Sequence, residues 1–211
     1  MPGTTPVYGF PYPEPTDLVA DYPALGQQLA EDIEDVLPGI GGLAAVAPTS
    51  IANSGGSAST TGNTTTFSGV SSVSLNGVFS STYENYRVVL THVVSTGTPN
   101  LLMRYRLSGA DRTDSLYTTD QSFSGGANRT DNQTQHLFLD TSTEYQSAQL
   151  DVIGPNLARF TSATGLGLRS VSRIAVFFGG VYRNAIAVDG LTIYPGSGTL
   201  TGSICVYGYR K

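Results

Sequence analysis

The sequence is poor in charge, and the charge it has is unevenly placed. Only 13% of the 211 residues are charged, and the formal net charge is −5. None of the 11 basic residues precedes Arg87, although eight of the 16 acidic residues do. The mild acidity argues against a general nucleic-acid-binding protein, which needs a basic face. The asymmetry predicts a division of labour between an acidic N-terminal part and a C-terminal body.

Cysteine, histidine and long apolar runs are also scarce. The single cysteine, Cys205, cannot form a disulfide within the chain, and its apolar neighbours predict a buried, inert thiol. His92 and His136 both stand in strand-like segments, so we expect strand histidines rather than bases or metal ligands. No apolar run reaches the roughly 18 residues that cross a membrane. No secretory leader is expected at the N-terminus.

The motifs that carry enzymatic chemistry are missing as well. The sequence has no H-x-x-H or C-x-x-C spacing, no G-x-S-x-G motif, no phosphate loop and no dinucleotide fingerprint. We therefore expect no catalytic residue, no metal and no cofactor. A structural role in a larger assembly is the interpretation that these absences leave.

Residues 1–20 are rich in proline, which favours an extended, polyproline-like arm. Tyr8, Phe10 and Tyr12 project from this arm. One interpretation is a disordered tail, and the other is an arm that docks its aromatic rings into grooves of a neighbouring protein. We favour the docking arm.

Residues 21–40 are expected to form one short amphipathic helix, with Asp21 as its N-cap. Leu29, Ile33 and Val36 follow the spacing of a coiled-coil seam, so we expect them to line a three-helix contact. The alternative is a helix packed on its own domain. Four carboxylates stand in the second half of the helix, where the helix dipole disfavours negative charge: Glu31, Asp32, Glu34 and Asp35. They indicate a basic partner surface, and the alternative is a solvated face.

Residues 41–63 have the Gly, Ser and Thr content of a flexible linker, which is not expected to add to a core. From residue 64 to residue 211, short β-type runs alternate with turn residues. This pattern predicts an all-β body of about nine or ten antiparallel strands, a β-sandwich or jelly roll. The dipeptide Asn76-Gly77 predicts a hairpin after a strand at 70–75. The other expected strands cover residues 86–94, 101–107, 116–123, 134–139, 145–153, 160–168, 174–182, 187–194 and 200–209.

Two polar segments of the body are candidates for recognising a receptor or glycan. The first contains Asp111, Arg112 and Asp114 and continues to Asp120. Oxygen-rich loops of this kind can hold Ca²⁺, but a solvated loop is the expected outcome because the spacing is not that of an EF-hand.

The second polar segment, residues 124–133, is expected to be a loop. It offers Asn128, Arg129 and Asp131 to a sugar. Tyr117 or Phe123 would supply the aromatic face on which a sugar ring stacks.

Two segments, 73–111 and 188–211, resemble the C-terminal β domain of tailed-bacteriophage virion proteins. The family pattern has an F-x₃-Y-x-x-Y-R strand, an R-x-R-x-S-G hairpin, a G-x-x-x-Y-P-x-S-G turn and a terminal Y-G-x-R. Residues 8–37 are also similar to the leader of phage tail-fibre and minor tail proteins. The matching positions are Phe79, Tyr83, Tyr86, Arg87, Arg104, Arg106, Ser108, Gly109, Gly190, Tyr194, Pro195, Ser197, Gly198, Tyr207, Gly208 and Arg210.

The resemblance implies a homotrimer attached to a virion, assembled in the host cytoplasm, with an N-terminal anchor and a C-terminal jelly roll. We expect a short tail fibre or minor tail protein, because the helical seam is too short for a long shaft. A head fibre or capsid decoration protein is one alternative. A carbohydrate-binding module is the alternative of another class, and a depolymerase is not expected.

Overall fold

The computed structural model describes residues 3–4, 10–14, 18–40, 42–97, 100–123, 126–139, 145–169 and 174–210. It divides the chain into two compact units, Met1–Ala44 and Ala45–Tyr209. Within the described part, no helix combines the length and the apolar character needed to cross a membrane.

The N-terminal unit is a small ribbon and a helix. Strands β1 (Gly3–Thr4) and β2 (Pro11–Tyr12) pair antiparallel, so the described part of the expected arm folds back on itself instead of forming one extended segment. A 3₁₀ turn (Val19–Asp21) leads into α1 (Tyr22–Ile40), which contacts β2. The helix confirms the one that the sequence predicts. Pairs of side chains four residues apart support it, with Gln27 donating to Glu31 at 2.8 Å and Gln28 to Asp32 at 2.9 Å.

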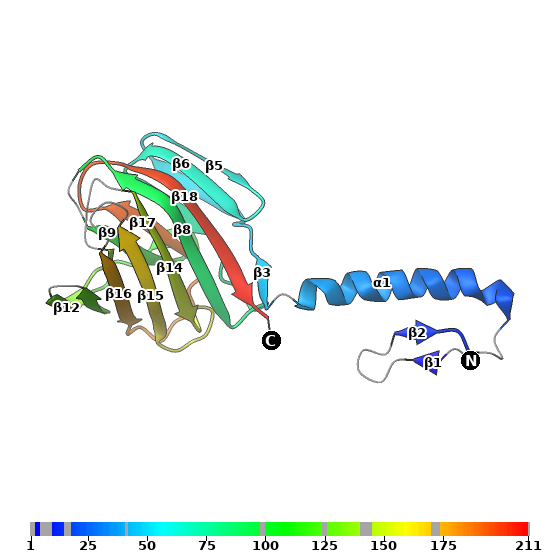
Figure 1. Ribbon diagram of the computed structural model, residues 1–211. Helices are drawn as coiled ribbons and strands as arrows, with labels where there is room; N and C mark the ends of the chain where they lie inside the picture. The colour runs from blue at the N-terminus through cyan, green and yellow to red at the C-terminus, as the bar shows by residue number, and fades with distance from the viewer. Residues whose placement is uncertain are drawn as a thin grey trace. The chain divides into compact units, whose positions relative to one another are not determined.

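The second unit is a sandwich of two antiparallel sheets, which confirms the predicted all-β class (Figure 1). The larger sheet has ten strands. In spatial order they are β12 (Gly126–Gln133), β11 (Tyr117–Phe123), β16 (Ala175–Tyr182), β15 (Thr161–Arg169), β14 (Gln146–Ile153), β8 (Asn85–Ser95), β18 (Leu200–Tyr209), β6 (Thr64–Val70) and β5 (Ser57–Thr61), with β3 (Leu43–Ala45) also paired to β18.

The smaller sheet has six strands. In order they are β10 (Ala110–Asp111), β9 (Leu101–Leu107), β17 (Gly190–Pro195), β7 (Ser72–Asn76) and β4 (Ser50–Ser54), with β13 (His136–Leu139) also paired to β9.

The core lies between the two sheets because each strand alternates apolar and polar residues, so that one face turns inward. The inner face of the ten-stranded sheet includes Leu90, Leu150 and Ile204, all 0–1% exposed. The six-stranded sheet contributes Leu75, Met103, Leu191 and Ile193. Phe79 and Tyr86 pack edge to face with ring centroids 4.9 Å apart, in the segment that carries the phage-like pattern.

The predicted linker at residues 41–63 is wrong, because this range contains β3, β4 and β5. β5 pairs with β6 along its whole length, and β4 pairs with β7. Ala44 is 8% exposed, and the Val46 N–H donates to the Val206 carbonyl at 3.0 Å. Small hydroxyl and alanine side chains fit a sheet edge that needs little apolar burial, which is why the composition resembled that of a linker.

The predicted hairpin at Asn76-Gly77 is also wrong. Gly77 does turn the chain, with φ +66°, but β7 pairs with β17 and β4 and not with the next strand, β8. The strand expected at 70–75 is divided at Ser71 between β6 and β7, which belong to different sheets. The turn therefore leads the chain from one layer of the sandwich to the other.

The expected loop at 124–133 is a strand over its described residues. Gly126–Gln133 forms β12, which pairs with β11 at the edge of the ten-stranded sheet. Most of its side chains are exposed, and this leaves no apolar alternation in the sequence for a strand prediction to detect.

Candidate functional site

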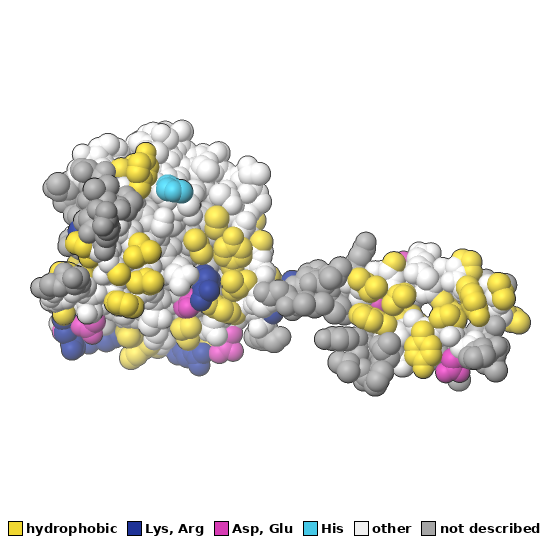
Figure 2. All heavy atoms as spheres, in the orientation of Figure 1, with side chains coloured by type: hydrophobic (Ala, Val, Ile, Leu, Met, Phe, Trp, Pro, Cys, Tyr) yellow, Lys and Arg dark blue, Asp and Glu magenta, His cyan; other side chains and the backbone are white. Residues whose placement is uncertain are grey.

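The outward face of the ten-stranded sheet carries most of the exposed large apolar side chains of the body. Figure 2 shows hydrophobic side chains gathered in patches over this part of the molecule. Among them, Phe177 of β16 is 62% exposed and Leu168 of β15 is 51% exposed. Exposed apolar groups that lie close together mark a surface for binding more often than isolated ones do.

A shallow hollow of about 510 Å³ lies beside Phe177, across β12, β11 and β16. Strand register explains it. Ser122 of β11 is opposite Phe177, and Asp120 is opposite Gly179. A Cβ atom placed on Gly179 would find no atom within 4 Å, so the sheet surface is open next to the phenyl ring.

Charged side chains form the rim of this hollow on the side of β12. Asp120 and Arg129 are opposite each other on β11 and β12, with Arg129 Nε 3.8 Å from Asp120 Oδ1 and 3.1 Å from Asp131 Oδ2. The hydrogen bond that Arg129 donates to Asp131 raises the pKa of Arg129 above its ordinary value. The side chains of Asp120 and Arg129 are 69% and 70% exposed. Exposed pairs of this kind hold each other weakly, so these groups are available to a ligand.

An apolar groove of about 320 Å³ adjoins the hollow on β8, β14 and β15. Val89, Leu166 and Leu168 line it, together with Ser147 and Gln149. Leu166 is the cross-strand partner of Phe177, so the groove and the hollow are neighbours on one face.

A polar cluster at the base of this face has a structural role. Arg87 donates two hydrogen bonds to Asp151, at 2.8 and 2.9 Å, and the Tyr209 hydroxyl donates to Asp151 at 2.5 Å. The hydrogen bond to Asp151 raises the pKa of Arg87, and the same bond lowers the pKa of the carboxyl. Burial raises the pKa of Tyr209 to about 12. All three polar groups are engaged with one another, and the cluster joins β8, β14 and β18.

The first predicted recognition segment is built into the body. Asp111 accepts hydrogen bonds from Arg106 and from Thr192. Asp114 accepts from Tyr182 at 2.8 Å and from Asn184 at 3.0 Å. Because these carboxylates already have partners, they are poor candidates for a receptor contact.

Arg112 belongs to the same hydrogen-bond network as Asp114, because it donates to Asp114 at 3.1 Å and to the Tyr182 hydroxyl at 3.3 Å. The hydrogen bond to Tyr182 raises the pKa of Arg112. Among the described side chains, no group of three or more His, Cys, Asp or Glu could hold a metal ion.

The second predicted segment is not built into the body in this way, because Asn128, Arg129 and Asp131 are all exposed on β12. Arg129, the partner of Asp120, lies on the face of the hollow, whereas Asn128 is the partner of the inward-pointing Gln121, so its side chain lies on the opposite face. Neither Tyr117 nor Phe123 supplies the exposed aromatic face that the sequence predicts. Tyr117 is fully buried and Phe123 is half-buried, so the exposed ring belongs to Phe177, which sequence reasoning missed. The Phe177-Phe178 pair was the available signal, because consecutive residues of a strand point to opposite faces.

The histidines and the cysteine lie where the sequence predicts, in strands. His136 is buried with its Nδ1 3.3 Å from the Thr119 hydroxyl, and burial lowers its pKa to about 3. His92 is exposed beside Tyr145, with ring centroids 6.1 Å apart. Cys205 is half-buried, contrary to the expected full burial, because it lies on the outward face of β18 with its sulfur 3.2 Å from the Thr64 hydroxyl.

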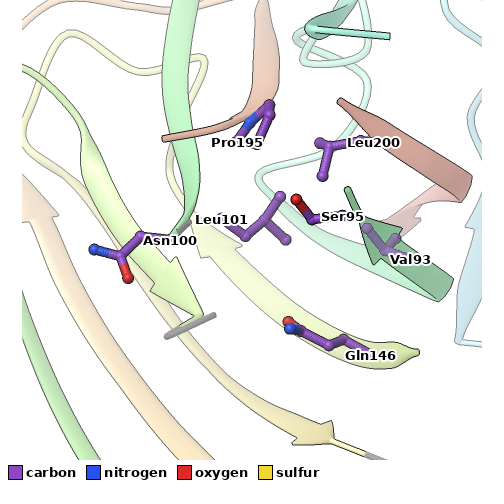
Figure 3. Close-up of a pocket in the computed structure, with 7 residues that line it drawn as sticks. All are labelled: Val93, Ser95, Asn100, Leu101, Gln146, Pro195 and Leu200. Carbon is purple, nitrogen blue, oxygen red and sulfur yellow. The ribbon is translucent and has the colours of Figure 1, made fainter. Parts of the chain in front are cut away.

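A much smaller cavity lies between the sheets (Figure 3). Its volume is about 10 Å³, enough at most for one water molecule. The lining residues are Val93, Ser95, Asn100, Leu101, Gln146, Pro195 and Leu200. This cavity is a packing defect and not a ligand site.

The predicted anchor and seam residues are only partly described. Tyr8 lies outside the described residues, Phe10 is half-buried and Tyr12 is 45% exposed. In the helix, Leu29 is half-buried and Ile33 is 37% exposed. The side chains of Glu34, Asp35 and Val36 are outside the description, and Glu31 and Asp32 accept the bonds from Gln27 and Gln28. The seam therefore stays a prediction.

No family model and no curated protein matches the chain. Among solved structures, the Caenorhabditis elegans galectin LEC-6 is 11% identical with a TM-score of 0.31, covering 63% of this chain and 88% of its own. The SPRY domain of human HERC1 is 13% identical with a TM-score of 0.34, and the match covers 71% of this chain and 90% of that domain. A third structure is domain 4 of AbnA, an extracellular arabinanase from Geobacillus stearothermophilus, in complex with arabinotriose. It is 13% identical with a TM-score of 0.31, and the match covers 78% of this chain and 84% of that domain. Scores this low carry no argument about function.

Proposed function

We propose that the chain is a non-enzymatic virion structural protein, a short tail fibre or minor tail protein that acts as a homotrimer. Its N-terminal unit attaches to the particle and its sandwich is presented to the host surface. The proposal rests on the resemblance of segments 8–37, 73–111 and 188–211 to phage virion proteins. A head fibre or capsid decoration protein fits the same architecture.

The observation that carries the proposal is the division of the chain into two units of different character. The sandwich has a closed core, whereas the N-terminal unit leaves Leu18 70%, Val19 77% and Tyr22 41% exposed. A unit this small cannot bury its own apolar side chains, so it gains stability by docking on another surface. This supports the role of the first 40 residues as an anchor.

Particle incorporation tests the anchor. Deletion of residues 1–20 is expected to leave a folded sandwich that no longer joins particles. The control is the full chain expressed at the same level, with both proteins quantified in purified particles. Normal incorporation of the shortened protein would overturn the anchor.

Two further measurements refine the role. Light scattering of the full chain is expected to give the mass of a trimer, and a monomer would count against the trimer. Electron microscopy of a label on the sandwich is expected to place it on the tail. A label on the head would favour the decoration protein.

A carbohydrate-binding module is the second candidate function, and the hollow beside Phe177 is the observation in its favour. The three low-scoring structures do not add to it. A glycan array with the full chain tests this candidate. Binding to no glycan would leave the structural role alone.

A further inference from the structure

Phe177 is placed as a platform and not as part of the core. It points outward from β16, and its neighbours across the strands are Ser122 and Leu166, with Ala175 and Gly179 two residues away on its own strand. Small side chains on three of these four sides leave the ring 62% exposed. A flat apolar ring of this kind offers a face on which the C–H groups of a sugar ring can lie.

The polar groups beside the ring suit hydroxyl groups. The Asp120 carboxylate can accept hydrogen bonds, and the Arg129 guanidinium can donate several. Both are exposed and line the hollow. Vicinal hydroxyls are both donors and acceptors, so they can satisfy such a mixed set, which a purely anionic or purely cationic ligand cannot.

The charge balance selects against an acidic ligand. Two carboxylates, Asp120 and Asp131, flank the single guanidinium of Arg129. The local charge is therefore negative, and a carboxylated or phosphorylated sugar would be repelled. A neutral sugar meets no such penalty.

The size of the hollow fits one or two sugar rings and not a whole polymer. Its volume of about 510 Å³ is in the range of small-molecule sites. The hollow is open, and the apolar groove at Leu166 and Leu168 continues from it, so a longer glycan has a path along the sheet.

We infer that this hollow binds a neutral sugar residue of a surface glycan, with Phe177 as the stacking face and Asp120 and Arg129 as hydroxyl partners. The inference goes beyond the proposed virion role, because binding here needs neither the N-terminal unit nor a particle. It names what the presented face would recognise.

The test is a titration of the full chain with neutral oligosaccharides built from glucose, galactose or mannose, followed by calorimetry or by NMR shifts. We expect saturable binding of at least one neutral series, with a Kd on the order of 1 mM or tighter. Matched oligosaccharides that contain uronic acids should bind at least about tenfold more weakly, as repulsion worth about 1.4 kcal/mol would produce. Absence of binding to every neutral series, or tighter binding of the acidic ones, would overturn the inference.

Three variants make the location testable. Phe177→Ala removes the platform, and Gly179→Val fills the hollow at a position where an added Cβ meets nothing within 4 Å. Both should weaken binding at least about tenfold, or about 1.4 kcal/mol, while the melting temperature stays close to that of the parent. Phe160→Ala is the control, because Phe160 is 54% exposed and does not line the hollow. Equal binding by the parent and Phe177→Ala would refute the assigned site.

The result is separable from the particle experiment. A chain that binds sugar but is not incorporated would contradict the virion role alone. A chain that is incorporated but binds no neutral sugar would contradict this inference alone.

Discussion

Arg106 is the one basic residue among those described whose side chain is buried, and hydrogen bonds hold it in place. Its guanidinium donates to Asn76 at 2.8 Å, to Ser74 at 2.9 Å and to Thr192 at 2.8 Å, and also to Asp111 and the Gly109 carbonyl. These contacts join β7, β9, β10 and β17 on the outer face of the six-stranded sheet. A buried charge is tolerated only when its partners are this complete.

Arg106→Lys should therefore destabilise the sandwich by about 3 kcal/mol, because an ammonium group cannot reproduce the planar set of donors. The measurement is urea unfolding of the variant and the parent. The matched control is Arg129→Lys on the exposed edge strand, where no change in unfolding is expected. Equal effects of the two substitutions would contradict a structural role for Arg106.

His136 gives the stability of the body a pH dependence. Burial among Tyr105, Tyr117 and Phe178 lowers its pKa from the ordinary 6.5 to about 3. The unfolded chain takes up a proton near pH 6.5 and the folded chain does not. The stabilising effect of the neutral ring is therefore complete above pH 6.5 and is lost as the pH falls toward 3.

The free energy of unfolding should fall by up to about 1.4 kcal/mol per pH unit below pH 6.5, when measured in urea between pH 7.5 and pH 5. Asp151 does not interfere in this window, because its carboxyl has a lowered pKa and titrates at more acidic pH. In His136→Leu the slope should be nearly flat, although the variant is less stable overall because the Thr119 hydroxyl loses its partner. An unchanged slope would mean that another group causes the dependence.

At the scale of the strand, two glycines on neighbouring strands have different surroundings: one is tightly packed and the other is open. Gly165 of β15 lies against β14, and an added Cβ would come within 2.2 Å of the Gln149 carbonyl oxygen. Gly179 of β16 faces open space. The first permits close strand packing, and the second leaves room on the surface.

Gly165→Ala should cost about 1–3 kcal/mol or more, because the β14–β15 ladder must shift to admit a methyl group. Gly179→Ala should be neutral or slightly stabilising, because alanine in a strand has less entropy to lose than glycine. Thermal or urea unfolding of the two variants in parallel provides the comparison. A larger loss for Gly179→Ala would contradict the register that places the two residues.

The strands that the sequence predicts correctly are those with an apolar inward face. The ten expected strands overlap β7, β8, β9, β11, β13, β14, β15, β16, β17 and β18. Among the missed strands, β4, β5 and β12 lie at sheet edges and bury little apolar surface, so hydrophobic periodicity does not mark them. β6 was missed as well, although it lies between β18 and β5 and buries Phe67 and Val70, because Thr, Ser and Gly fill its other positions. Their pairing depends on a neighbouring strand that is far away in the sequence or already formed, and a local pattern cannot report that.

The sequence predicted some of the residues of the candidate site, but not which residues lie next to one another in space. Asn128 and Arg129 stand out as polar residues in the sequence, and the structure places the side chain of Arg129 beside the hollow. The exposed ring on the same face as Arg129, Phe177, comes from a strand about 50 positions later and is identified only through the register of β11 and β16. The predicted partners Asp111 and Asp114 were lost to internal hydrogen bonds, which depend on the same long-range register.

At the scale of the molecule, the body begins about 20 residues earlier than the sequence predicts. β3, β4 and β5 cover strands that would otherwise be open edges, because β5 pairs with β6 and β4 pairs with β7. Unpaired edges are prone to aggregation. The boundary of the independent unit therefore lies near residue 43 and not at residue 64.

A chain that begins at Leu43 should fold to a soluble body whose melting temperature is close to that of the sandwich in the full protein. A chain that begins at Thr64 should be clearly less stable, or should aggregate, because β6 and β7 each lose a partner strand. Scanning calorimetry and size-exclusion chromatography of the two chains give the comparison. Equal behaviour would show that residues 43–63 do not belong to the core unit.

The position of β18 has a consequence for how the sandwich is made. This strand lies between β8 and β6, yet it follows every other strand of the body in the sequence. The contact of Thr64 with Cys205 spans 141 positions. Until residues 200–209 have been synthesised and have paired, β6 and β8 therefore each lack the partner of one edge. Folding is completed late and depends on long-range pairing, so we expect it to be slow.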